Sequence, residues 1–322
     1  MVEKRKGLLL PSLAIILSET LFGFSMFFAR MGLAVVKEDS IQFLAFRFTV
    51  GFLFMTLLLA LKVVHASYRG KEIGLLLICG LCNPMVSQAL ETTALTCAPT
   101  TQNAIITSTM PIMMIVLGVL FFREKVRLNA VAFAALSVAG VLMTQYGEVG
   151  GTYTLGLVLN ISAVTVASLS RLFMRRAREQ FTAFESVYVT TGMGALTFWA
   201  VTLSQHGIRG DLGSFFTGLW CPDFIISVLY MGIGSCVFAF MLMSYSAAYL
   251  PVEIYAVFIT ICTVVGIWAG VFLLGEPFRP VDVIGTAIIL IGVVGTNICH
   301  NRRQGEPCLE QEAATENGPS DL

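Results

Sequence analysis

Two charged residues, Glu19 and Arg47, lie deep inside long apolar stretches of the chain. A charge at the centre of a membrane costs roughly 2.5–3.5 kcal/mol on insertion scales, so such residues usually face a bundle interior or water. A helix rises about 1.5 Å per residue, which puts the two residues at depths from which their side chains can meet. We predict that they form a central ion pair or hold the carboxylate and ammonium groups of a zwitterionic solute. The alternative is an ion pair that only tethers two helices.

Glu19 has a second candidate role, which is to carry a coupling proton. Burial disfavours the charged form of a carboxyl group, so a carboxyl group in an apolar setting takes up a proton readily. The position therefore predicts substrate binding or coupling to a proton or another ion.

Other candidates are polar and aromatic residues inside the apolar stretches. For substrate binding or coupling they are Asn83, Gln88, Gln102, Asn103, Tyr188, Tyr255 and Trp268. We expect the amides to line a vestibule or to form hydrogen bonds between helices, and the aromatic side chains to wall a pocket or simply to pack. Arg30 and Arg171 lie near the ends of their stretches, so we expect them to extend to the membrane interface.

The composition of the chain is that of a membrane protein. Hydrophobic residues make up 56% of the chain and charged residues 12%, with a mean hydropathy of +0.82. A soluble domain is about one quarter charged. Apolar stretches long enough to cross about 30 Å of hydrocarbon as helices cover 10–33, 41–61, 73–93, 99–122, 126–146, 154–174, 183–205, 223–245, 251–274 and 280–299. We predict an all-α integral membrane protein with ten transmembrane helices.

The basic residues predict the orientation of the chain. With the amino terminus in the cytoplasm, the external segments carry only Lys37, Arg209 and Arg279, whereas most other Lys and Arg residues fall in internal segments. Internal segments of membrane proteins are enriched in Lys and Arg. We therefore expect both termini to be cytoplasmic and the protein to lie in the plasma membrane, in contact with the lipid bilayer.

Part of the sequence recurs 152 residues later without a gap. Pro99, Gly118, Glu124, Arg127 and Gly140 are repeated in register as Pro251, Gly270, Glu276, Arg279 and Gly292. A duplication with five spans per copy places the two copies upside down relative to each other, as in many secondary transporters.

Two features of the repeat have structural interpretations. An acidic residue after a span favours the positive amino-terminal end of the helix that follows, so Glu124 and Glu276 are expected to stabilise the fifth and tenth helices. Gly266 and Gly270 form a G-x-x-x-G motif, which predicts close helix packing within the chain, with a dimer face as the alternative. The expected state is a monomer or a weak homodimer.

The duplicated pattern resembles the EamA domain of the drug/metabolite transporter superfamily. The resemblance rests on a proline-started helix, a glycine and an acidic residue at its end, and a glycine in the next helix. It implies two inverted five-helix repeats, 10–146 and 154–299, between a cytoplasmic amino-terminal segment, 1–9, and a disordered cytoplasmic tail, 300–322. It also implies alternating-access transport, often outward, of small organic solutes such as amino acids or related metabolites.

Other classes of function receive less support from the sequence. No motif of a hydrolase, metalloprotease or phosphate-binding enzyme occurs, so we expect no enzymatic activity, no catalytic residue and no cofactor. Cys79 and Cys82 form a C-x-x-C pair without a second ligand pair, so we expect no metal. The formal net charge of +0 gives no indication of a nucleic-acid partner. A drug exporter, a transporter of the nucleotide-sugar type and a membrane sensor are the alternatives.

Overall fold

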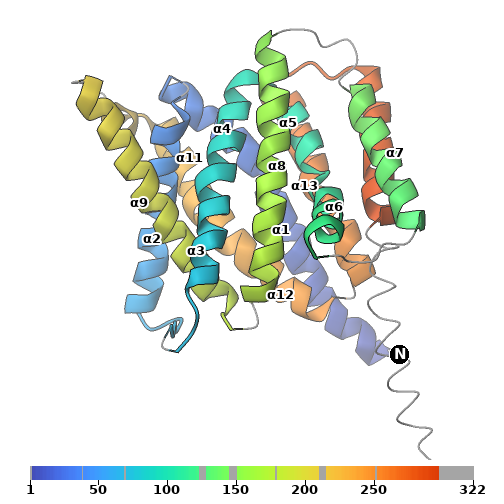
Figure 1. The fold of residues 1–322 in the computed structure, drawn as a ribbon, viewed down its shortest axis with the longest axis horizontal. Coiled ribbons are helices and arrows are strands. Elements are labelled where there is room, and N and C mark those ends of the chain that lie inside the picture. The colour runs from blue at the N-terminus through green and yellow to red at the C-terminus, as the bar shows by residue number, and fades with distance from the viewer. Residues whose placement is uncertain are drawn as a thin grey trace, which may run out of the picture.

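The computed structural model describes residues 2–37, 39–68, 70–122, 128–144, 151–177, 180–209, 215–250 and 252–296. Within these ranges the chain is helical and contains no strand (Figure 1). Seven helices there are long and apolar enough to cross a membrane, and three shorter apolar helices cover Val131–Thr144, Thr260–Leu273 and Pro280–Thr296. The prediction of an all-helical multi-pass membrane protein is confirmed, and the count of ten spans stays a prediction.

The described residues of the first half form seven α-helices and one π-helical segment. The helices are α1 (Val2–Val35), α2 (Ser40–Ala60), α3 (Gly74–Gly80), α4 (Ser87–Cys97), α5 (Thr100–Thr107), α6 (Met110–Phe122) and α7 (Leu128–Thr144). A π-helical segment, Leu81–Val86, joins α3 to α4.

The second half repeats this plan. Its helices are α8 (Gly151–Ala177), α9 (Ala183–Arg209), α11 (Pro222–Leu229), α12 (Phe240–Tyr249), α13 (Val252–Leu273) and the last helix, Pro280–Thr296. A short 3₁₀ turn, Thr217–Trp220, precedes α11, and a π-helical segment, Tyr230–Ala239, joins α11 to α12.

Two of the predicted spans are interrupted for local reasons. Asn83 leaves the helical conformation, with φ −143° and ψ 116°, because the proline that follows it disfavours the helical region. Helix α5 ends before Ser108, whose hydroxyl donates to the carbonyl of Ile105 at 2.6 Å. Such side-chain bonds compete with the helical ladder.

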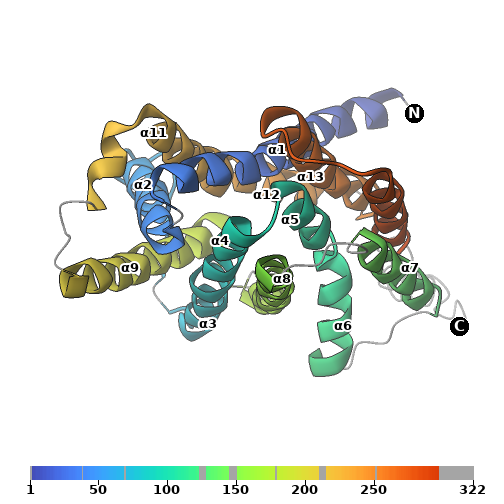
Figure 2. The same cartoon turned by 90° about the horizontal axis from the view of Figure 1, so that it is seen from above.

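Helix α1 runs obliquely across the bundle, among helices of both halves (Figure 2). Helix α1 packs along α13, α12 and α11, while α2 packs against α9. Helix α8 lies between α4 and α6 and contacts both of them. The walls of the interior therefore come from both halves of the chain.

Helix α7 and the last helix pack through glycines, and their contacts are reciprocal. A Cβ on Gly140 would lie 2.9 Å from the Gly285 oxygen, and a Cβ on Gly292 would lie 2.7 Å from the Phe133 oxygen. Gly292 and Gly285 are the repeat counterparts of Gly140 and Phe133. The Ser137 hydroxyl also donates to the Ile289 carbonyl, 152 residues away, at 3.3 Å. The two helices thus present equivalent surfaces to each other.

Replacement of Gly292 by alanine is expected to destabilise the protein. The added methyl group would lie 2.7 Å from both the Phe133 oxygen and the Ser137 Cβ, so the helices must move apart. We expect a loss of roughly 1–3 kcal/mol, measured as a lower midpoint of thermal unfolding in detergent. The control is Gly74→Ala, because a Cβ there meets nothing within 4 Å. An unchanged midpoint for Gly292→Ala would contradict the packing.

Candidate functional site

Arg47 and Glu91 are linked through the amide of Gln88 in the interior. The Arg47 Nη1 donates to Gln88 Oε1 at 2.6 Å, and Gln88 Nε2 donates to Glu91 Oε2 at 2.8 Å. Arg47 is only 8% exposed, and its guanidinium carbon also lies 5.2 Å from the centre of the Phe48 ring. A neutral amide therefore satisfies a buried cation on one side and a carboxylate on the other.

Close helix packing brings this chain of contacts together. A Cβ on Gly232 would lie 2.8 Å from the Arg47 carbonyl oxygen and 3.0 Å from the Gly51 nitrogen. Helix α2 thus touches the π-helical segment Tyr230–Ala239, and Cys236 of that segment lies 3.8 Å from the Arg47 guanidinium. The widened turns of a π-helix occur frequently at functional sites.

Glu19 is buried on α1, with 4% of its surface exposed. Its carboxylate accepts no hydrogen bond and forms no ion pair with any side chain in the described part of the chain. The predicted Glu19–Arg47 ion pair is thus not formed, because Arg47 turns to Gln88 instead. A buried carboxylate without a partner is costly, so its retention points to a ligand or a proton.

Arg171 of α8 faces the interior rather than the membrane interface. Asn160, Val164 and Ala167 are buried and share the helical face of Arg171, since they precede it by 11, 7 and 4 residues. Arg171 is nevertheless exposed, and it acts electrostatically on both Glu19 and Glu91. Arg171 thus continues the buried face of α8 towards the two carboxylates. The prediction of an interfacial Arg171 is corrected accordingly.

The other predicted residues divide between packing and polar roles. Asn160 Nδ2 donates to Asn103 Oδ1 at 2.7 Å, and both side chains are buried, so this pair joins α8 to α5. Gln102 is also buried, on the same turn of α5 as Asn103. Asn83 is half-buried in the break between α3 and α4. The bond between Asn160 and Asn103 favours the interhelical alternative.

The aromatic candidates pack against other aromatic side chains. Tyr188 stacks on Phe52 with ring centres 4.9 Å apart, and its hydroxyl lies 3.3 Å from that of Thr56. Trp268 is 46% exposed and contacts Phe24 edge to face at 6.0 Å. The side chain of Tyr255 lies outside the described residues, as does Glu124.

Arg30 and Cys79 each contact a backbone carbonyl oxygen of another helix. Arg30, which is predicted to extend to the interface, donates to the carbonyl of Leu95, near the end of α4. Cys79 lies 3.8 Å from the Ser170 carbonyl, which is a packing contact between α3 and α8. In the described ranges, no group of three His, Cys, Asp or Glu side chains is placed to bind a metal ion.

Glu276 stabilises a helix of the other half rather than the helix that follows it. Its two carboxylate oxygens accept from the backbone nitrogens of Thr100 and Thr101, at 2.6 and 2.8 Å, at the start of α5. Gly275, with φ +67°, ends α13 and turns the chain toward α5. A Cβ on Gly270 would lie 2.8 Å from the Glu276 carboxylate, so this glycine leaves room for the cap. The expected partner of Glu276 is corrected from the last helix to α5.

The G-x-x-x-G motif packs inside the chain, as the first of its two interpretations predicts. A Cβ on Gly266 would lie 3.1 Å from Ala104 Cβ, and one on Gly270 would lie 2.7 Å from Thr101 Cγ2. Both glycines therefore contact α5. This face of α13 is covered by the chain itself.

The apolar helices and the charged interior are those of a multi-pass helical membrane protein. The family described as "EamA-like transporter family" matches residues 9–146 and 154–298. The chain belongs to this family.

Similar proteins agree with this family. "Uncharacterized transporter YcxC" of Bacillus subtilis (strain 168) is 26% identical over 298 residues, which cover 92% of this chain and 95% of that protein. An "Uncharacterized transporter" of Archaeoglobus fulgidus is 22% identical over 196 residues, covering 59% of this chain and 65% of that protein. A solved protein structure superposes with a TM-score of 0.60 at 17% identity, covering 88% of this chain and 97% of that chain, and supports the fold alone.

Replacement of Gln88 by leucine is expected to disrupt the link between Arg47 and Glu91. The guanidinium would lose its acceptor at 2.6 Å and the carboxylate its donor at 2.8 Å. Unsatisfied buried groups cost about 1–3 kcal/mol each, so we expect a lower midpoint of thermal unfolding. Thr165→Val, on the exposed side of α8, is the control and should leave the midpoint unchanged. Equal midpoints for Gln88→Leu and the native protein would show that the link does not stabilise the fold.

Replacement of Glu276 by alanine is expected to weaken the start of α5. Loss of the two bonds to Thr100 and Thr101 leaves helix amides without an acceptor, at a cost of about 1–2 kcal/mol. Glu276→Gln should retain part of the cap. Hydrogen exchange of the first turn of α5 should therefore increase in the order native, Glu276→Gln, Glu276→Ala, and the reverse order would contradict the assignment.

Proposed function

We propose that this protein is a secondary transporter that exports a small zwitterionic solute, such as an amino acid or a related metabolite, by alternating access. The observation that carries the proposal is the arrangement of Glu19 and Arg171. Glu19 is buried on α1 and has no hydrogen-bond partner among the described residues, while Arg171 is inward-facing and exposed on α8. One acidic and one basic group, both available, match an ammonium and a carboxylate.

The four interior charges have unequal roles in this proposal. Arg47 and Glu91 are already joined through Gln88, and therefore shape the site. Glu19 and Arg171 make no hydrogen bond within the described residues, and are free to bind a ligand. Glu19 binds the ammonium group, and Arg171 replaces Arg47 of the sequence prediction as the residue that binds the carboxylate. A coupling proton on Glu19 remains compatible, since it would compete with the ammonium group.

The proposed cycle uses two inverted repeats, 10–146 and 154–299. The reciprocal contacts of α7 with the last helix support this symmetry, since contact pairs there exchange under a shift of 152 residues. A π-helical segment occurs between the same pair of helices in each half, at Leu81–Val86 and at Tyr230–Ala239. Ten spans with cytoplasmic termini in the plasma membrane complete the proposal, together with outward transport as the family resemblance implies.

The charge balance of the interior argues against the alternative substrates. A nucleotide sugar carries phosphates and would need an excess of cationic groups. The interior instead combines two carboxylates, Glu19 and Glu91, with Arg47 and Arg171. A drug exporter would need a large apolar pocket, whereas the charged groups of this interior favour a polar solute.

The test compares solutes in the medium of matched cultures that express the native protein, Glu19→Gln or Arg171→Gln at equal membrane levels. We expect an amino-acid-like solute to accumulate outside native cells and to fall about tenfold or more in both variants, because each removes one charge that binds the solute. The control is Arg176→Gln, on another face of α8. It removes a positive charge, as Arg171→Gln does, and should export normally.

Different outcomes reject different parts of the proposal. Normal export by both variants would remove Glu19 and Arg171 from the site. Export of solutes that lack a carboxylate, unaffected by Arg171→Gln, would replace the zwitterion by a cation. Uptake instead of release would reverse the direction.

A further inference from the structure

Two structurally equivalent contacts tie the halves of the chain together at opposite ends of the bundle. Each contact joins the start of the second helix of one half to the segment after the second helix of the other half. We name them the Glu185 latch (Ser67, Lys71, Thr182 and Glu185) and the Gln42 latch (Asp39, Gln42, His206 and Phe215).

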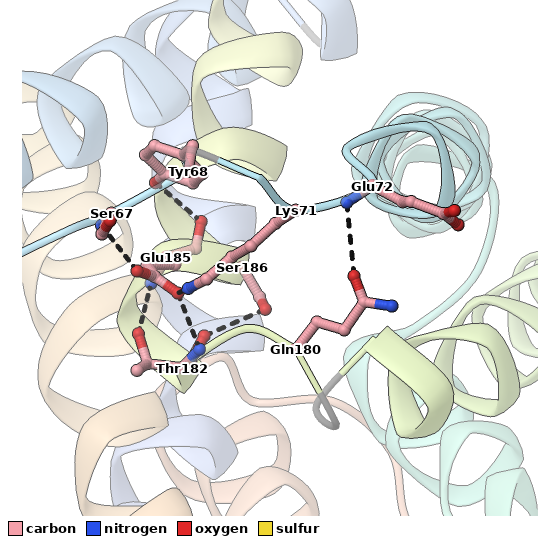
Figure 3. A network of polar contacts seen from close by, with 8 residues as sticks. All are labelled: Ser67, Tyr68, Lys71, Glu72, Gln180, Thr182, Glu185 and Ser186. Carbon is pink, nitrogen blue, oxygen red and sulfur yellow. Dashed lines mark hydrogen bonds and ion pairs between the residues drawn. The ribbon is translucent and has the colours of Figure 1, made fainter.

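The Glu185 latch is a buried carboxylate with three donors (Figure 3). Glu185 accepts from Ser67 N at 2.7 Å, from Lys71 Nζ at 2.7 Å and from Thr182 N at 2.9 Å. Its own nitrogen donates to Thr182 Oγ1 at 3.2 Å, which completes a capping box at the start of α9. The side chain of Glu185 is 3% exposed, so these donors are needed to offset its burial.

Neighbouring side chains hold the segment of Ser67 and Lys71 in place. The Tyr68 hydroxyl donates to the Glu185 carbonyl at 3.1 Å. Burial, followed by the charge of Glu185 and by Tyr188, raises the pKa of Tyr68 to about 12, so this donor stays protonated at physiological pH. The Lys71 ammonium also lies 5.2 Å from the centre of the Phe181 ring.

The Gln42 latch has the same plan at the other end. Asp39 precedes α2 and accepts from Gln42 N at 3.0 Å, as Thr182 accepts from Glu185 N. Gln42 Nε2 then donates to the Phe215 carbonyl at 2.7 Å, in the segment after α9. His206 Nε2 lies 3.7 Å from Asp39 Oδ2 and rests against the Phe215 ring. Gln42 and Glu185 are both the third residue of their helix, and both reach across to the other half.

We propose that the two latches are the alternating restraints of the transport cycle. The Glu185 latch must break for the bundle to open at the end predicted to be cytoplasmic, and the Gln42 latch must break for it to open at the predicted external end. The proposal rests on the alternating access proposed above. The Lys71–Glu185 ion pair measures 2.7 Å, whereas the Gln42 latch rests on a neutral hydrogen bond from the Gln42 amide and on the longer Asp39–His206 contact at 3.7 Å. The Glu185 latch is therefore the stronger restraint.

Cys262 provides a native reporter for the test. It lies on α13, half-buried, and acts electrostatically together with Glu19, Glu91 and Arg171, so it marks the interior. In a variant whose other cysteines are replaced, the rate of modification by a membrane-impermeant thiol reagent is measured from each face of oriented vesicles. This measurement of Cys262 accessibility requires neither a known substrate nor a transport assay.

Breaking one latch should expose the interior to one face. We expect Lys71→Met to raise the rate of Cys262 modification from the predicted cytoplasmic face roughly tenfold and to lower it from the other face. Gln42→Leu should have the opposite effect, with a smaller change. Lys71→Arg retains the donor and should behave as native, and Glu72→Gln, exposed on the same segment, should change neither rate.

The outcomes separate the latches from the proposed function. If both faces reach Cys262 in the native protein but neither Lys71→Met nor Gln42→Leu changes the ratio of rates, the latches are only structural and alternating access stands. If one face alone reaches Cys262 in every variant, both the latches and alternating access are rejected. A misfolded variant is recognised by a lower midpoint of thermal unfolding, and Glu185→Gln, which keeps a capping side chain, then replaces Lys71→Met.

Discussion

The structure depends on the cost of placing charged and hydrogen-bonding groups in hydrocarbon. No water is available in hydrocarbon, so every polar group there needs a partner within the protein. An α-helix meets this need for the backbone, because its N–H and C=O groups form hydrogen bonds within the same segment. Most of the chain meets this requirement with continuous apolar helices. The exceptions, where a helix widens or breaks and where charges are retained, lie in the interior between the two halves.

Glycine is important in this structure because it lets helices approach closely enough for their backbone atoms to touch. Gly51 and Gly232 bring α2 against the π-helical segment near Arg47, and Gly140 and Gly292 join α7 to the last helix. Membrane helices gain little from burial against one another, since lipid is as apolar as the helix surface, so close packing and hydrogen bonds must hold them together. The contact between Gly51 and Gly232 also places Arg47 of α2 beside Cys236 of the π-helical segment.

Three of the polar contacts between the halves lie at helix starts. Glu276 caps α5, Glu185 caps its own helix α9 and also accepts from the Ser67 and Lys71 segment, and Gln42 reaches the segment of Phe215. The start of a helix carries free amides and a partial positive charge, which makes it the natural place for an acceptor to dock. Contacts of this kind are stronger than packing alone, yet a small displacement breaks them. They suit a molecule whose halves must stay associated and still move.

The sequence by itself determined the helical class, the position of the apolar segments, the duplicated pattern and membership of the family, because hydropathy summed over about 20 residues is a large and local signal. It also singled out Glu19 and Arg47 as interior charges. Only the tertiary structure decided their partners: Arg47 meets Gln88, Glu19 lies within the electrostatic reach of Arg171, and Glu276 caps α5. Asn160, Val164 and Ala167 share a helical face with Arg171 by their spacing, but only the structure shows that this face is buried. Successive residues point about 100° apart around a helix, so the partner of a side chain depends on how the whole helix is rotated about its axis. That rotation is set by contacts between residues far apart in the chain, and no local sequence pattern contains it.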